Sequence, residues 1–246
     1  MLTICIPSFD EAPTIGIVLW RLRKVFETEP REYEVVVLDD GSTDATAETL
    51  KQYARVMPLT VIRHAERQGY PATLDALARA AAARTRYPRR DALVFMQGDL
   101  TDLPEQLPEL FRPFDGGADL VVGEAAAPSG APVPVQRLRR LALWLVRPIS
   151  RTAGVNDPLG TMRLVRVSVA REAIKRAGSE PLTTAPGWAA NAELLARFAP
   201  LARRVETVPL APPRYDLRQR ATRVRAWSSA FELLRFARAR RAPRAS

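Results

Sequence analysis

One stretch decides the fold: Ala92-Leu93-Val94-Phe95-Met96-Gln97-Gly98-Asp99-Leu100-Thr101-Asp102-Leu103-Pro104-Glu105. A short run that is apolar on both faces predicts a buried parallel strand, and the proline suits the first turn of a helix. Asp99 then lies at the carboxyl end of a central strand, the edge where open α/β sheets bind ligands. Beside Gly98, which lets a ligand come close, its carboxylate is placed to hold a divalent cation on a diphosphate. Taken alone, Asp99 and Asp102 are equally compatible with capping the next helix.

Apolar runs and amphipathic segments alternate through the first half of the chain. Four further strands are predicted at Leu2–Ile6, Tyr33–Leu38, Leu59–Ile62 and Leu120–Val122, and helices are expected to open near Pro13, Asp44 and Pro71. This alternation predicts an α/β fold with a mostly parallel central sheet and helices on both faces. Residues 124–135 are rich in Ala, Pro, Ser and Gly and predict a loop. We therefore expect a first half at 1–123 and a second half of the same domain at 124–221.

The sequence pattern of the second half predicts a more helical region. A basic amphipathic helix is expected at Val135–Ile149, an extended segment at Thr161–Val167, helices near Val169–Ala177 and Trp188–Ala199, and a last strand at Arg204–Pro209. Residues 222–246 form a third segment, in which Thr222–Arg240 predicts a basic amphipathic helix. Such a helix either docks on the core or lies on an anionic bilayer, and the pattern leaves both open.

Composition bounds the classes of site and partner. The 246 residues are 47% hydrophobic, typical of a globular protein, and contain one cysteine and one histidine, which excludes a disulfide within the chain and metal sites built of thiolates or imidazoles. No run approaches the roughly 20 apolar residues of a spanning helix, and the first run is too short for a signal peptide. We expect a cytoplasmic protein or one on the inner face of the plasma membrane. The net charge of +10, mostly arginine, favours anionic partners, although a GC-rich genome produces the same enrichment.

Acidic turns follow three of the predicted strands. They are Pro7-Ser8-Phe9-Asp10-Glu11, Asp39-Asp40-Gly41-Ser42 and Gln97-Gly98-Asp99. In this order they resemble the nucleotide-sugar half of a family 2 glycosyltransferase with the GT-A, Rossmann-like fold. Within that family the chain is most similar to the dolichyl-phosphate mannose synthase group. The likeness covers about 1–220.

The resemblance implies a role for each turn. The nucleotide pocket would be lined by Pro7, Phe9, Glu11, Asp39, Asp40, Gly69, Gln97, Gly98 and Asp99. In this set Asp39 would accept the N–H of the base. Asp99 stands in the Asp-x-Asp position and would hold Mg²⁺ or Mn²⁺, with Gln97 as a weak or indirect ligand in place of the usual first aspartate.

The resemblance also implies an acceptor side. Residues 157–163 resemble the turn near the acceptor, so Asp157 would act there. Arg214 and Arg220 lie in the segment that resembles the loop closing over the diphosphate, and they would neutralise charge on the leaving group. A cradle for an acceptor phosphate would consist of Arg137, Arg139, Arg140 and Arg163.

These roles imply inverting transfer of a sugar from a UDP- or GDP-linked donor. Residues 187–192 lack the aspartate that hydroxyl-glycosylating relatives place near here, and an ionised phosphate needs no general base. The acceptor is therefore expected to be a polyprenyl phosphate or another anionic lipid, met at an anionic membrane surface. Open alternatives are a nucleotide-sugar-binding protein that has lost catalysis and a GT-A enzyme with a hydroxyl acceptor. The acidic turns argue against a nucleic-acid-binding protein, and the oligomeric state stays open.

Overall fold

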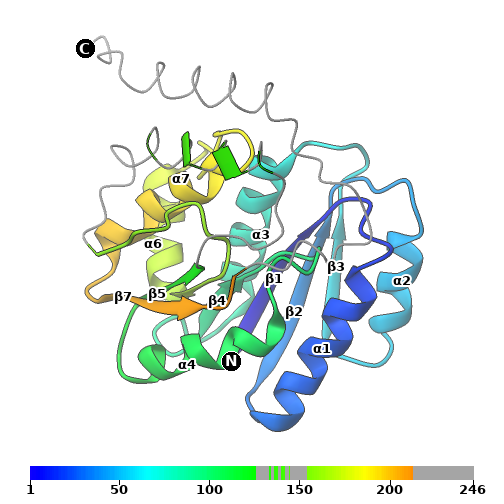
Figure 1. The fold of residues 1–246 in the computed structure, drawn as a ribbon, viewed down its shortest axis with the longest axis horizontal. Helices are drawn as coiled ribbons and strands as arrows, with labels where there is room; N and C mark the ends of the chain where they lie inside the picture. The colour runs from blue at the N-terminus through cyan, green and yellow to red at the C-terminus, as the bar shows by residue number, and fades with distance from the viewer. Residues whose placement is uncertain (126–132, 134–135, 138–139, 142–143, 145–153, 213–246) are drawn as a thin grey trace.

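The computed structural model describes residues 1–125, 133, 136–137, 140–141, 144 and 154–212. A seven-stranded sheet in the order β3-β2-β1-β4-β6-β5-β7 runs through the molecule (Figure 1). Its strands are β1 (Leu2–Ser8), β2 (Tyr33–Asp39), β3 (Leu59–Arg63), β4 (Ala92–Phe95), β5 (Leu120–Ala125), β6 (Arg163–Arg166) and β7 (Val205–Leu210). The helices are α1 (Ile15–Thr28), α2 (Thr46–Tyr53), α3 (Tyr70–Arg84), α4 (Leu107–Asp115), α6 (Val167–Ala177) and α7 (Ala189–Phe198).

The sheet is mostly parallel, which confirms the predicted fold class. Strands β3, β2, β1 and β4 all run in one direction, and β5 and β7 are parallel to each other. Strand β6 lies antiparallel between β4 and β5. The sequence predicted this segment as extended but not its direction.

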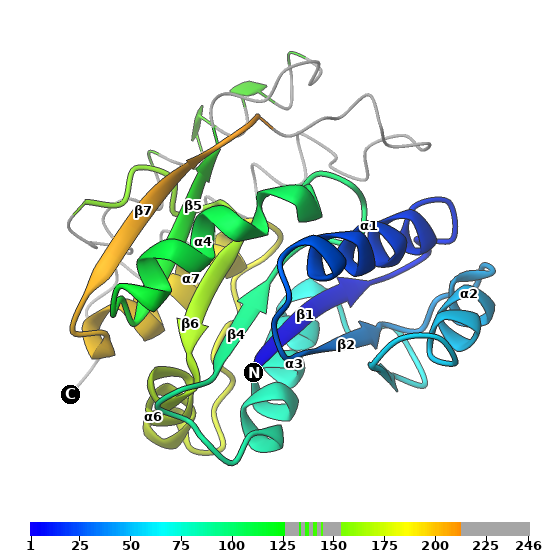
Figure 2. The ribbon, with the colours of Figure 1, turned by 90° about the horizontal axis from the view of Figure 1, so that it is seen from below.

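Helices cover both faces of the sheet (Figure 2), and an apolar layer lies between the helices and the sheet on each face. One layer contains apolar side chains of α1, α2 and α4, and the other contains those of α3, α6 and α7. Side chains along the parallel strands alternate between them: Ile4 and Ile6 of β1 belong to the first layer, and Cys5 belongs to the second. This alternation is why these strands read as continuous apolar runs in the sequence.

The carboxyl ends of β1, β2 and β4 meet at one edge of the sheet. Ser8 pairs with Asp39 in the β1–β2 register, and the Met96 N–H donates to the Cys5 carbonyl between β1 and β4. In the described part of the chain, only two non-glycine residues have positive φ, Asp10 at 47° and Leu100 at 64°, and both lie in turns at this edge. Backbone conformations of this kind concentrate at functional sites.

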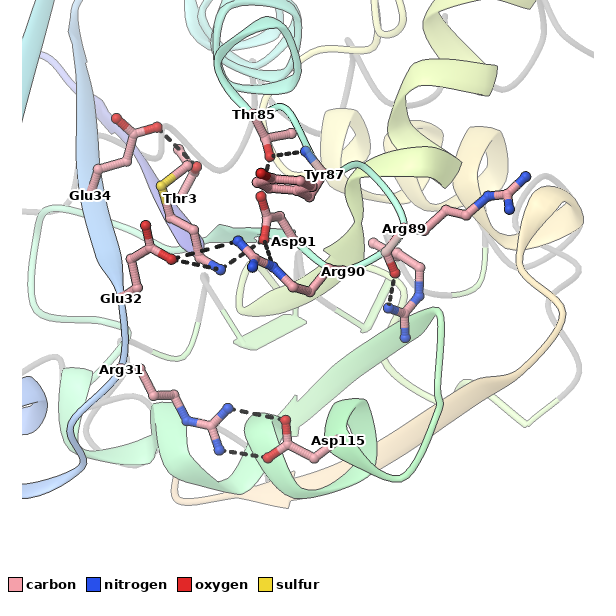
Figure 3. Close-up of polar contacts among 12 residues, drawn as sticks. Thr3, Arg31, Glu32, Glu34, Thr85, Tyr87, Arg89, Arg90, Asp91 and Asp115 are labelled. Carbon is pink, nitrogen blue, oxygen red and sulfur yellow. Dashed lines mark hydrogen bonds and ion pairs between the residues drawn. The ribbon is translucent and has the colours of Figure 1, made fainter.

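The amino-end edge carries a different set of polar contacts (Figure 3). The Asp91 carboxylate, just before β4, accepts hydrogen bonds from the Met1 ammonium at 2.8 Å, from Arg90 Nε at 3.0 Å and from the Thr85 hydroxyl. Burial alone would raise the Asp91 pKa, but these bonds outweigh it and lower the pKa. The buried Asp91 carboxylate therefore joins the chain before β4 to the amino end of β1, and two cations pair with it.

Three sequence predictions concern residues that are wholly or mostly outside the described ranges. They are the loop at 124–135, the helix at Val135–Ile149 and the helix at Thr222–Arg240. Within the described ranges, the helices are all too short or too polar to cross a bilayer.

Candidate active site

The turn after β1 is bonded to both neighbouring turns of the carboxyl-end edge. The Asp10 N–H donates to Ser42 Oγ at 2.8 Å, and Asp10 Oδ1 accepts the Thr43 N–H at 2.7 Å. On the other side, the Thr14 hydroxyl donates to the Gly98 carbonyl at 2.9 Å. The three acidic turns predicted from the sequence are thus one hydrogen-bonded assembly.

Asp39 is fully buried at the end of β2. Its carboxylate accepts the Ser42 N–H at 2.9 Å and the Arg63 guanidinium at 2.7 Å. Arg63 also donates to the Ser42 carbonyl at 2.8 Å. A base can reach this carboxylate only if neighbouring groups shift, so the contact implied by the family resemblance requires a local rearrangement.

Asp40 organises the loop that leads into α3. It accepts the Gln68 and Gly69 N–H groups at 2.8 Å each, and His64 Nδ1 lies 2.8 Å from the same carboxylate. Gly69 has a φ of 93°, a conformation that favours glycine. Asp40 therefore fixes the backbone of the loop at Gln68 and Gly69.

Two residues to which the sequence interpretation gave no individual role, Ser8 and Arg67, also lie at this edge. The Arg67 guanidinium stacks 4.2 Å from the centre of the Phe9 ring. Ser8 is buried, and its hydroxyl has no hydrogen-bond partner among the described residues. An unsatisfied buried hydroxyl is unusual and fits a group that bonds a ligand. The register of β1 beside Asp39 was the available signal for Ser8.

The turn after β4 packs tightly at its glycine. A Cβ at Gly98 would lie 3.1 Å from Ile15 Cδ1 and 3.2 Å from Ile6 Cγ2, so a larger residue would require these side chains or the turn to shift by a few tenths of an ångström. The Asp99 carboxylate, which is 6% exposed, accepts the Thr101 N–H at 3.1 Å and the Thr101 hydroxyl. Thr101 therefore fixes the orientation of Asp99.

A metal fits this turn only with help from a ligand. Across the described ranges, histidine, cysteine and acidic side chains do not gather in groups of three or more that could hold an ion. Mg²⁺ usually takes one or two carboxylates together with substrate phosphates and waters. Asp99 therefore suits a cation that arrives with a diphosphate rather than one caged by the protein.

Gln97 is engaged in hydrogen bonds on both its backbone and its side chain. Its side-chain Nε2 donates to the Tyr70 hydroxyl at 2.7 Å, and its backbone N–H donates to Asp102 at 2.9 Å. The Tyr70 hydroxyl in turn donates to Asn191 Oδ1 of α7 at 2.8 Å. The described contacts of Gln97 are thus structural, which does not favour the expected role as a metal ligand.

Arg163 lies inside the protein rather than at an acceptor surface. It is 1% exposed, and its guanidinium donates to the carbonyls of Pro158, at 2.9 Å, Gly160 and Asn191. Burial lowers its pKa from 12.5 to about 10. This geometry does not favour the expected contact with an acceptor phosphate, because Nη1 and Nη2 already donate to carbonyls, and Nε, which has no hydrogen-bond partner among the described residues, is buried.

The remaining site predictions divide by position. Asp157 is buried and accepts the Leu159 N–H at 3.2 Å, so it shapes the same turn. Arg137 and Arg140 are exposed, as are Val133 and Trp144. Arg139, Arg214 and Arg220 lie outside the described residues.

This sheet, with acidic turns assembled on one edge, is the architecture of a sugar-nucleotide transferase. The chain belongs to glycosyl transferase family 2, whose family model matches residues 3–173.

Among curated proteins, the chain is 27% identical over 170 residues to a bactoprenol glucosyl transferase of Shigella phage SfV. It is equally similar to the SfII prophage-derived bactoprenol glucosyl transferase of Shigella flexneri. Each match covers 67% of this chain and 51% of the relative, so the chain spans about half the length of these relatives.

Solved structures show the same fold. Glucosyl-3-phosphoglycerate synthase from Mycobacterium tuberculosis, in complex with phosphoglyceric acid, superposes with a TM-score of 0.66 at 19% identity, over 98% of this chain and 79% of that chain. A second structure of that synthase, with Mn²⁺, UDP and glucosyl-3-phosphoglycerate, gives the same TM-score at 20% identity, over 98% and 79%. These likenesses confirm the predicted GT-A architecture.

Proposed function

We propose that this chain is the catalytic part of an inverting glycosyltransferase that moves a sugar from a nucleoside diphosphate sugar to a polyprenyl phosphate. The carrying observation is the assembly of the three turns after β1, β2 and β4 on one sheet edge, joined through Asp10, Ser42, Thr14 and Gly98. Family membership supports it, because the matched region 3–173 contains all three turns.

The donor is proposed to be UDP-linked. Support comes from the M. tuberculosis synthase, which was crystallised with UDP and Mn²⁺. Ser8 and Asp39 lie side by side in the β1–β2 register, and after the local rearrangement that the buried Asp39 requires they would offer a hydroxyl and a carboxylate to a base. The rest of the predicted pocket is Pro7, Phe9, Glu11, Asp40, Gly69 and Gly98.

The diphosphate is proposed to bind beside Asp99. Mg²⁺ or Mn²⁺ would be held there by Asp99, and it supplies positive charge that neutralises the departing diphosphate. Arg214 and Arg220 keep their proposed role in the same neutralisation. Thr101 contributes by orienting Asp99, and Gly98 contributes by letting the turn pack closely on Ile6 and Ile15.

The acceptor is proposed to be a polyprenyl phosphate at the cytoplasmic membrane face. The names of the bactoprenol glucosyl transferases support a polyprenyl acceptor, and Asn191 in α7 is a buried neutral amide that cannot act as a general base. Exposed Arg137 and Arg140 offer charge-assisted hydrogen bonds to a phosphate. Exposed Trp144 suits the bilayer interface. The likeness to dolichyl-phosphate mannose synthases stays part of this proposal.

Radiolabelled transfer tests the proposal directly. The protein is incubated with UDP-glucose or GDP-mannose, a polyprenyl phosphate in detergent and Mn²⁺, and lipid-linked label is extracted, with EDTA as the metal-free control. We expect metal-dependent transfer to the polyprenyl phosphate from the UDP-linked donor. Transfer only to sugar hydroxyls would contradict the acceptor. UDP binding without transfer or donor hydrolysis would favour the alternative, a nucleotide-sugar-binding protein.

The proposed contact of Arg137 and Arg140 with the acceptor phosphate has its own test. Arg137→Ala combined with Arg140→Ala should raise the KM for polyprenyl phosphate by about tenfold, because two charge-assisted contacts are lost. The matched control is Arg55→Ala with Arg86→Ala, a pair that is also exposed but lies on other segments. An equal effect of both pairs would indicate a general charge effect instead of a phosphate cradle.

A further inference from the structure

Three neutral side chains from three separate segments form one chain of hydrogen bonds, here called the amide relay. It consists of Gln97 after β4, Tyr70 at the start of α3 and Asn191 in α7. Gln97 Nε2 donates to the Tyr70 hydroxyl at 2.7 Å, and the hydroxyl donates to Asn191 Oδ1 at 2.8 Å. Asn191 Nδ2 then donates to the Leu159 carbonyl at 3.2 Å.

The direction of the relay is fixed by its last member. A backbone carbonyl only accepts, so Asn191 must donate through its amide nitrogen and accept through its oxygen. The single hydroxyl proton of Tyr70 is therefore used on Asn191, and the hydroxyl oxygen must accept from position 97. It follows that position 97 needs a side chain that donates, which glutamine can do and an ionised carboxylate cannot.

A second link runs parallel to the relay. Asp102 accepts both the Gln97 backbone N–H, at 2.9 Å, and the Thr161 hydroxyl. Both links join the turn that carries Asp99 to the 157–163 turn, which Arg163 holds from within. The three relay residues and Arg163 line a cavity of about 10 Å³, close to the space that one water needs.

We propose that Gln97 is a positioning residue and not a metal ligand, and that the amide relay holds the 157–163 turn in register with the donor edge. This rests on the proposed function. A carboxylate at position 97 would compete with Asn191 for one hydroxyl proton and would place a second negative charge beside Asp102. Gln97, which stands in the Asp-x-Asp position, and Asn191 in α7 are thus joined through Tyr70 by hydrogen bonds between uncharged side chains.

The decisive variant is Gln97→Glu, which keeps the shape of the side chain and replaces the donor with an acceptor. A metal ligand at position 97 would gain charge, so Mn²⁺-dependent UDP binding would tighten. A positioning residue would not: we expect UDP and Mn²⁺ affinities within about twofold of wild type, measured by calorimetry. We expect kcat/KM for the polyprenyl phosphate acceptor to fall by about tenfold or more, the scale of lost outer contacts at active sites.

Tyr70→Phe breaks the same relay at its centre and should give the same split between unchanged UDP affinity and weakened acceptor kinetics. Since both changes break one chain, the double variant should lose no more than about twofold beyond either single one. Matched controls are Gln52→Glu and Tyr87→Phe, the same chemical changes at exposed positions. Should Gln97→Glu fail to fold, Gln97→Met and Tyr70→Phe carry the test.

The outcomes separate the two proposals. Tighter Mn²⁺ binding by Gln97→Glu, or unchanged acceptor kinetics in Tyr70→Phe, overturns the amide relay while the proposed transfer stands. Absence of both UDP binding and sugar transfer in the wild-type protein overturns the proposed function, and the relay's role falls with it.

Discussion

The two edges of the central sheet differ in the partners of one buried carboxylate each, Asp91 and Asp99, although Asp39 at the carboxyl-end edge is also paired with an arginine. At the amino-end edge, Asp91 accepts hydrogen bonds from the Met1 ammonium and from Arg90, which lies beside it in Figure 3. At the carboxyl-end edge, Asp99 is oriented by the N–H and hydroxyl of Thr101, and Asp40 by the N–H groups of two loop residues. Fixed cations offset the charge of a carboxylate, whereas neutral donors such as those of Thr101 orient a carboxylate without cancelling its charge.

This difference predicts a division of labour. Carboxylates at the amino-end edge should contribute to folding, and those at the carboxyl-end edge to binding and transfer. Substitutions of one carboxylate at a time test this division, because Asp→Asn keeps the size of the side chain, removes its charge and replaces one acceptor oxygen with a donor.

The largest effect is expected for Asp99→Asn. Sugar transfer should fall by about 100-fold or more, since the oriented charge that holds the cation at the diphosphate is lost. The free energy of unfolding should change by less than about 1 kcal/mol, as measured in urea. The control is Asp115→Asn, an exposed carboxylate paired with Arg31 away from the site. More than a tenth of wild-type transfer remaining in Asp99→Asn would place the diphosphate elsewhere.

Asp39→Asn should weaken UDP binding by about tenfold or more, because a hydrogen bond to a charged group contributes roughly 1.5–3 kcal/mol. Calorimetric titration with UDP and Mn²⁺ measures this. Asp119→Asn is the matched control, since Asp119 is also paired with an arginine, Arg166, at 2.7 Å but lies just before β5. Equal weakening by both variants would mean that loss of an ion pair, and not of a base contact, causes the change.

Asp91→Asn should destabilise the fold by about 1–3 kcal/mol and leave UDP affinity unchanged. The sign with pH follows from the lowered Asp91 pKa: the carboxylate stabilises the fold above its unfolded pKa of about 3.9 and loses that contribution as the pH falls through the folded value. Urea unfolding of wild type and variant at pH 7, 5, 4 and 3 should give curves that converge only below about pH 4. A difference that does not shrink between pH 5 and pH 3 would assign the effect to packing.

The sequence was sufficient to predict the strands whose ends form the amino-end and carboxyl-end edges. The parallel strands are apolar on both faces, so β1, β2 and β4 appear as uninterrupted runs that end in acidic turns, and the structure has them there. The antiparallel direction of β6 could not be predicted, because a short extended segment carries no signal for the side from which the chain enters the sheet.

Partners of the site residues were harder to predict than the residues themselves. Tyr70 and Asn191 are 121 positions apart, and Arg63 reaches Asp39 across 24 positions. Local patterns encode which residues end a strand, but such pairs depend on how the helices pack over the sheet. For the same reason the burial of Arg163 was not foreseen, since an arginine in a basic protein is normally exposed.

The smallest effect is expected when the same substitution, Thr→Val, is made once at each edge. Thr14→Val removes the hydroxyl that joins the β1 turn to the Gly98 carbonyl, and Thr85→Val removes the hydroxyl that bonds Asp91. Both hydroxyls are buried, so each change should cost about 1 kcal/mol of unfolding free energy. Only Thr14→Val should also weaken UDP binding, by a few-fold. Of the two hydroxyl bonds compared, only the one from Thr14 to the Gly98 carbonyl connects the turn after β1 to the turn that carries Asp99. If Thr85→Val weakened UDP binding equally, the two edges would be coupled through the strands, and the division between a folding edge and a binding edge would be wrong.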